Sequence, residues 1–207
     1  MYTDEQILKI KKRMEQQMQQ KEKNENLEEE LQQSIYDGTI KLLGKDVTFE
    51  RRLIPEFEIS VLMPQDFEAL DETLRKIVYP SSNGPQHVFT SEDEYMNISF
   101  KQNSNIIKKE QMKEFVQLSR KIMEFSGPKV KIVKTGEIER DDMSIGTMEF
   151  ISNAIDGVAY NYMGFVPLET GVLLVSIVYK NAKKKRMNPI AKEILQSIQC
   201  IKQEEEA

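Results

Sequence analysis

Few residues in this sequence could carry out chemistry. His87 is the only histidine and Cys200 the only cysteine, so a Ser-His or Cys-His dyad would have to use His87. His87 falls at the start of an expected strand, and Cys200 falls on the expected C-terminal helix. These positions are typical of an ordinary polar strand residue and of a small buried hydrophobic residue. We therefore predict no catalytic residue and no enzyme activity.

Acidic and glycine-containing patterns add no further site. Asp141-Asp142 and Glu92-Asp93-Glu94 fall in predicted turns, where solvated charge is the default. A single histidine excludes a His-rich metal site, and neither G-x-x-x-x-G-K nor G-x-G-x-x-G occurs to hold a phosphate. We expect neither a metal nor a cofactor.

One basic cluster separates the last long strand from the last helix. Five basic residues fall within seven positions: Lys180, Lys183, Lys184, Lys185 and Arg186. No aromatic residues alternate with them, and the whole chain has a net charge of -5, so the cluster is typical of a solvated connector and not of a nucleic-acid site. A local acidic surface of a partner protein is the remaining option.

Composition indicates a globular protein of one main domain. The chain has 207 residues, 39% of them hydrophobic and 30% charged. An acidic balance favours neither nucleic acid nor anionic lipid as a partner. The sequence has no 18-residue apolar run that would cross a membrane and no apolar signal region near Met1. With one cysteine, it fits a reducing, cytoplasmic setting.

The stretch from Val158 to Tyr179 predicts a hairpin at the centre of a sheet. β-branched and aromatic residues crowd both arms, and Pro167 to Gly171 supply the turn. In the second arm, Val172, Leu174 and Val178 alternate with Leu173, Val175, Ile177 and Tyr179, so both faces are apolar. We expect cover on each face.

Other patterns predict about eight strands in one antiparallel sheet with helices on it, an α+β fold. Residues 70–77 predict a short helix, and Ile107 to Phe125 predict the main packing helix. Its expected packing stripe is Gln111, Phe115, Leu118, Ile122 and Phe125. Asn188 as N-cap and Pro189 as the first helical residue predict the start of the last helix. The expected domains are an arm over residues 1–36, a body over 37–202 and an acidic tail over 203–207.

The arm predicts a helix over residues 3–23, with Thr3 and Gln6 placed as a capping box. Its narrow apolar stripe consists of Ile7, Ile10, Met14 and Met18. Such a stripe can bury little alone, so the arm is either a solvated tail or a helix that binds the body, a second copy or another protein. If it binds, these four residues are the expected partner-binding residues.

Residues Phe57 to Phe67 read F-E-I-S-V-L-M-P-Q-D-F, and Ile194 to Ile198 near the end of the last helix read I-L-x-S-I. Together with the order of the long helix and the later strands, these segments resemble the PsbP-like (Mog-type) fold superfamily, which includes many small bacterial proteins. This resemblance covers residues 45–200. It implies an α/β/α sandwich and, for the family, binding, chaperone or accessory roles. No functional residue of the family carries over to this sequence.

The sequence therefore favours a non-enzymatic protein-binding or accessory module that acts through its N-terminal helix, without nucleic acid or membrane. Two alternatives stay open. One is a small-ligand carrier with a pocket between sheet and helix. The other is a hydrolase with an unrecognised site.

Overall fold

The computed structural model describes residues 12, 28, 31–93, 95–126, 129–154 and 157–201. The predicted arm stripe of Ile7, Ile10, Met14 and Met18 lies outside these residues, and so does the predicted acidic tail, 203–207. The last part of the predicted arm is described. Ile35 begins a short 3-10 helix, η1 (Ile35–Asp37), and is 1% exposed, so it belongs to the hydrophobic core.

The larger of two antiparallel sheets has seven strands in the order β4-β5-β6-β10-β9-β8-β7. The hairpin predicted at the centre is β9 (Gly157–Leu168) and β10 (Gly171–Lys180), and β10 also pairs with β6, as expected for a central strand. The other strands are β4 (Glu68–Ala69), β5 (His87–Thr90), β6 (Asn97–Asn103), β7 (Lys131–Glu139) and β8 (Ser144–Ala154). We call the face with Leu173, Val175 and Ile177 the inner face, and the face with Val172 and Leu174 the outer face.

The edges of this sheet are irregular. At one edge, β4 is only two residues long. At the other, the register of β7 against β8 shifts between Ile132 and Lys134, which makes a β-bulge.

A second, four-stranded sheet has the order β1-β2-β3-β11, so the prediction of one sheet was wrong. Its strands are β1 (Thr39–Leu42), β2 (Lys45–Ile54), β3 (Ile59–Pro64) and β11 (Gln199–Cys200), with a 3-10 turn, η2 (Pro55–Phe57), between β2 and β3. The described residues hold eleven strands against the eight expected, and the two shortest, β4 and β11, account for much of the difference.

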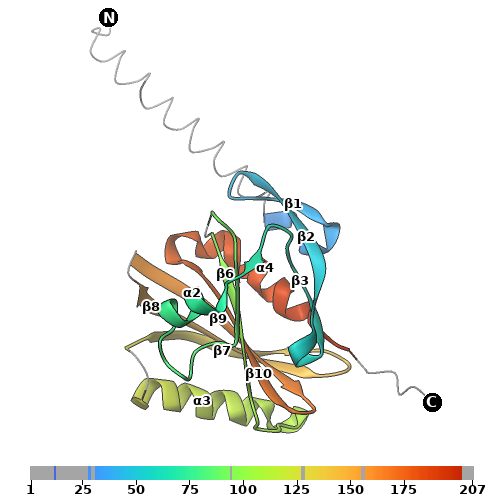
Figure 1. Cartoon of the computed structure of the whole chain (residues 1–207), viewed down its shortest axis with the longest axis vertical. Coiled ribbons are helices and arrows are strands. Elements are labelled where there is room, and N and C mark those ends of the chain that lie inside the picture. Colours follow the sequence, from blue (N-terminus) through green and yellow to red (C-terminus); the bar gives the residue numbers. More distant parts are fainter. Residues whose placement is uncertain are drawn as a thin grey trace, which may run out of the picture.

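Helix α4 (Lys184–Gln196), which follows the 3-10 turn η4 (Asn181–Lys183), lies between the two sheets (Figure 1). It contacts β9 and β10 on one side and β3 on the other, and Met187, Ile190, Ala191, Ile194 and Leu195 are buried. The predicted start at Asn188 was wrong, because the helix begins at Lys184 and Pro189 lies inside it. Little more than one turn precedes Pro189, so its missing N–H removes only one early backbone hydrogen bond.

Helix α3 (Met112–Ser126) follows a 3-10 turn, η3 (Lys109–Gln111), and packs on the outer face over β7 and β8 (Figure 1). The predicted packing stripe was wrong. Met112 and Val116 are buried, whereas Leu118 and Ile122 are more than half exposed. A Cβ on Gly146 of β8 would lie 2.4 Å from Val116 Cγ2, so the glycine allows this side of α3 to approach the sheet.

Candidate functional site

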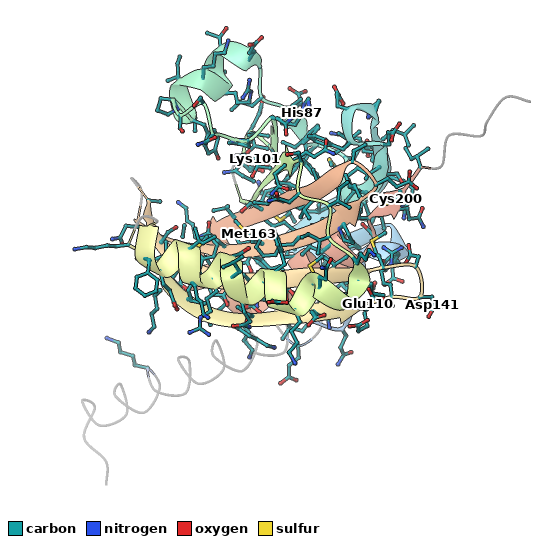
Figure 2. The ribbon with its side chains drawn as sticks, turned by 90° about the horizontal axis from the view of Figure 1, so that it is seen from below. His87, Lys101, Glu110, Asp141, Met163 and Cys200 are labelled. Carbon is teal, nitrogen blue, oxygen red and sulfur yellow. The ribbon has the colours of Figure 1, made fainter. Side chains whose placement is uncertain are left out.

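The structure separates the residues that sequence analysis considered for chemistry. His87 is half-buried, its Nε2 lies 3.8 Å from Glu56 Oε1, and its ring packs edge-on against Phe57. Figure 2 shows His87 and Cys200 well apart, so they do not form a dyad.

Cys200 was predicted on the last helix as a buried residue, and this was wrong. It lies on β11 opposite Ile59 and its side chain is exposed, because α4 ends at Gln196 and the chain continues as a strand along β3. Partial desolvation by neighbouring groups, helped by the charge of Asp142, raises the pKa of its thiol. A raised pKa disfavours the reactive thiolate.

The predicted acidic turns and the basic cluster have structural contacts. Asp142 accepts two hydrogen bonds from Arg140, and Asp93 pairs with Lys45. In the basic cluster, Lys184 Nζ lies 4.5 Å from the ring centroid of Tyr160. Within the described residues, no group of three or more His, Cys, Asp or Glu side chains is placed to hold a metal.

A buried polar network lies under the first turns of α4. The Glu149 carboxylate accepts hydrogen bonds from the Tyr160 hydroxyl and, at 2.9 Å, from Asn188 Nδ2. The Tyr179 hydroxyl donates to Asn188 Oδ1. Burial, with Glu149 nearby, raises the pKa of Tyr162 to about 12. These side chains hydrogen-bond to one another, and they fix α4 to the inner face of the sheet.

An open hollow of about 500 Å³ lies between η2 and the end of the β9–β10 hairpin. Its lining is rich in amides, hydroxyls and carboxylates: Pro55, Glu56, Phe57, Glu58, Gln86, Gln102, Asn103, Ser104 and Thr170. Gln102 Nε2 donates to Thr170 Oγ1, and Gln86 Oε1 accepts from the Gln102 N–H. The hollow can offer hydrogen bonds to a polar molecule.

An exposed apolar strip runs along α3 beside its contact with the sheet. Phe115 is half-buried and packs edge-on against Phe165 of β9, while Leu118, Ile122 and Phe125 are 54%, 56% and 88% exposed. We call these four residues the α3 flank. Beside them lies a hollow of about 310 Å³ lined by Ile107, Gln111, Glu114, Phe115, Gln117, Leu118 and Lys121.

The α3 flank adjoins a part of the outer sheet face that stays half-buried. Because Leu174 lies opposite Phe165, and Ser176 opposite Met163, these side chains share that face. We call the residues of β9, β10 and β6 there the open face: Met163, Leu174, Ser176, Val178, Ser99 and Lys101. Figure 2 shows Met163 next to α3, with Lys101 farther away and towards α2 (Glu72–Val78).

The outer face is covered again at β5, beyond the open face. Val88 lies opposite Ser99, which places it on the outer face, yet it is only 3% exposed. Lys101 donates from Nζ to the carbonyl of Asn83, in the loop that follows α2. Arg75 of α2 donates to the carbonyl of Pro85 in the same loop. The open face is therefore bounded by α3 on one side and by the α2 loop on the other.

Comparison with known proteins identifies the architecture. No protein-family profile matches the sequence, and no curated protein matches it either. Among solved structures, cyanobacterial PsbP (CyanoP) from Synechocystis sp. PCC 6803 matches 73% of this chain and 92% of its own, with a TM-score of 0.54 at 11% identity.

The chain has a PsbP-like fold.

Other solved structures match this PsbP-like body less closely. LpqN, involved in cell envelope biogenesis of Mycobacterium tuberculosis, has a TM-score of 0.44 at 10% identity and matches 73% of this chain and 90% of its own. A protein of unknown function from Pseudomonas aeruginosa, PA94, has a TM-score of 0.40 at 13% identity over 72% of this chain and 94% of its own. In the described part of the chain, no helix has the length and apolar character needed to cross a membrane.

On the PsbP-like body, sequence reasoning missed the Glu149 network, although a signal was present. Glu149 is the single charged residue between Ser144 and Ala154, in a strand that is otherwise uncharged. The tyrosines at 160 and 162 alternate along the next strand, so their side chains share one face. A lone carboxylate in an apolar strand next to aligned tyrosine hydroxyls indicates a buried hydrogen-bonded group.

Proposed function

We propose that this protein is a non-enzymatic protein-binding module with an accessory or chaperone-like role. The observation that supports this proposal is the α3 flank. Single exposed apolar side chains are ordinary, but Leu118, Ile122 and Phe125 share one side of a regular helix and continue onto the open face. A contiguous apolar patch of this kind is typical of a surface that binds a protein.

The strength of such a contact can be estimated from the side chains. Full burial of a leucine, isoleucine or phenylalanine contributes about 1.5–3 kcal/mol. For the three exposed members of the α3 flank this gives roughly 5–9 kcal/mol before the loss of translational freedom and the ordering of side chains are subtracted. The flank alone would support weak binding, and the open face beside it would strengthen the contact.

Co-purification of the full chain from its native cells tests the proposal. We expect a specific protein to be recovered with the wild type and recovery to fall more than about tenfold with Leu118→Asp/Ile122→Asp, because each buried charge costs several kcal/mol. Leu53→Asp is the matched control, since Leu53 is 62% exposed on the other sheet. Equal recovery by all three proteins would contradict a role for the α3 flank.

A small-ligand carrier is a second candidate, and the hollow of about 500 Å³ beside Phe57 favours it. A carrier would show a rise in melting temperature with a polar metabolite, and Gln102→Ala would reduce that rise. This hollow lies between connecting segments of the two sheets. The ligand pocket was expected elsewhere, between sheet and helix. The hydrolase alternative has less support, since the contacts described for His87 are with Glu56 and Phe57.

A further inference from the structure

We propose that the α3 flank and the open face of one copy bind the N-terminal arm, residues 3–20, of a second copy. This inference rests on the proposed protein-binding function and names the partner surface. The sequence predicts an apolar stripe on the arm, and the described structure leaves an apolar surface of the body exposed. The arm has the predicted stripe of Ile7, Ile10, Met14 and Met18, and the body has the α3 flank.

The two apolar surfaces match in length. From Phe115 to Phe125 the α3 flank extends over ten helical rises, or about 15 Å along the helix. From Ile7 to Met18 the arm stripe extends over eleven such rises, or about 17 Å if it is helical. A helix laid beside α3 would therefore place its whole stripe against the whole flank.

The open face has the width of one helix. Three strands, β9, β10 and β6, lie between β8 and the strand with buried Val88, and α3 already covers Phe165 and Val172 at one end of β9 and β10. At about 4.8 Å per strand they span about 14 Å. An α-helix with its side chains is about 10 Å across, so one added helix would complete the outer helical layer. It would cover Leu174 and Val178, which the sequence predicts to need cover.

Charge also favours the arm. Residues 101–134 carry nine lysines and arginines against three glutamates, in a chain whose net charge is -5. Lys101 on the open face and Lys121 beside the hollow belong to this basic region. In the arm, residues 19–30, which follow the stripe, carry five glutamates against two lysines, whereas the docked segment 3–20 carries three acidic and four basic residues. The charge attraction is therefore carried by the acidic residues beyond the stripe, and such attraction would orient the docked helix and increase its rate of association.

The position where the arm joins the body favours a second copy over the same copy. Glu193 of α4 accepts hydrogen bonds from Ser34 Oγ and the Ile35 N–H, which fixes this point next to α4. Helix α4 packs on the inner face of the large sheet, whereas the α3 flank is on the outer side (Figure 1). To reach its own flank the arm would have to pass around the sheet, and a second copy removes that requirement.

A complementation experiment with full-length chains tests this inference. Light scattering during size-exclusion chromatography should show self-association of the wild type at micromolar concentration. Ile10→Asp/Met14→Asp and Leu118→Asp/Ile122→Asp should each be monomeric, and Leu53→Asp should behave as the wild type. An equimolar mixture of the two double variants should form a dimer, because an intact arm then meets an intact flank. Melting temperatures within a few degrees of the wild type show that the variants are folded, and Leu118→Ser/Ile122→Ser replaces the flank variant if it is not.

Other results would overturn the inference. These are a monomeric wild type, a mixture that stays monomeric, or self-association that both double variants retain. If a monomeric wild type captures another protein through the flank, and the arm variant captures it equally, the protein-binding function stands and the arm inference fails. If a monomeric wild type instead sediments with phosphatidylglycerol vesicles, and the flank variant does not, the flank binds a membrane surface and both proposals fail.

Discussion

Along β10, neighbouring residues meet different surroundings. Leu173, Val175 and Ile177 are fully buried beneath α4 and the second sheet, whereas Leu174 and Val178 on the outer face are half-buried. Both sets are apolar, so composition does not distinguish them. What differs is the cover. Helix α4 and the second sheet complete the inner face, whereas α3 covers the outer face over β7 and β8 and as far as Phe165 and Val172, and leaves Leu174 and Val178 half-buried. The inner face therefore stabilises the fold, and the outer face is available for binding.

The largest expected difference between the two faces is in adjacent leucines. Leu173→Ala should lower the free energy of unfolding by about 3–4 kcal/mol, because it leaves a cavity in a closed core. Leu174→Ala should cost only about 1 kcal/mol, since water already reaches that side chain. Urea titrations of the two variants measure the difference. Equal losses would show that the outer face is as closed as the inner face.

Alkaline pH should act on the inner face. Burial and Glu149 raise the pKa of Tyr162 to about 12, above its ordinary value of 10.0. A raised pKa means that the unfolded chain loses this proton first, so stability is intact below pH 10 and falls as the pH rises towards 12. This group alone should remove about 3 kcal/mol over that interval. Circular dichroism and tyrosinate absorbance should change together, and Tyr162→Phe should reduce the loss. A pH-independent stability from 10 to 12 would contradict the burial of Tyr162.

On each face of the large sheet, one glycine allows a helix to pack closely. A Cβ at Gly164 would lie 2.7 Å from both methyl groups of Leu195 on α4, and one at Gly146 would lie 2.7 Å from Met112 Sδ on α3. Each Gly→Ala change should cost about 2 kcal/mol through overpacking. Hydrogen exchange should increase across both sheets for Gly164→Ala but mainly in α3, β7 and β8 for Gly146→Ala. The same exchange pattern in both variants would show that the two faces unfold as one unit.

The smallest effect is expected on the α3 flank. Ile122→Ala should change the free energy of unfolding by less than about 0.5 kcal/mol, since the side chain is 56% exposed. Val116→Ala, on the buried side of the same helix, is the matched control and should cost about 2 kcal/mol or more. If Ile122→Ala proves as costly as Val116→Ala in a thermal melt, the flank has a cover within the free chain.

Local patterns predicted most of the elements of this fold but not their arrangement. Alternation and turn residues were sufficient for β9 and β10, because a hairpin is set by neighbours in sequence. They could not show that β2 and β3 form a separate sheet, since that depends on α4 entering between the sheets. The two-residue strand β11 has no pattern long enough to be recognised.

Periodicity also could not identify which side of α3 packs. Met112, Val116 and Met123 and the four residues of the flank together form an apolar arc that covers about half of the helix surface. A sheet contact needs only part of such an arc. Gly146 decides which part, since the missing side chain leaves space for Val116 and Met112. The candidate binding surface is the rest of the arc. Its apolar character could be predicted from the sequence, but its exposure could not.

The irregular edges of the large sheet affect how copies can come together. The edge strand β4 offers only two residues for pairing, and β7 carries a bulge with exposed Lys131 and Lys134 on either side of it. Short, bulged and lysine-bearing edges disfavour the strand-to-strand growth that leads to fibrils. Pairing of strand edges uses backbone hydrogen bonds and depends little on side-chain identity, whereas contact through a helix depends on its side chains. Because the edges of the large sheet disfavour such pairing, this sheet can expose apolar surface for recognition while limiting its tendency to aggregate.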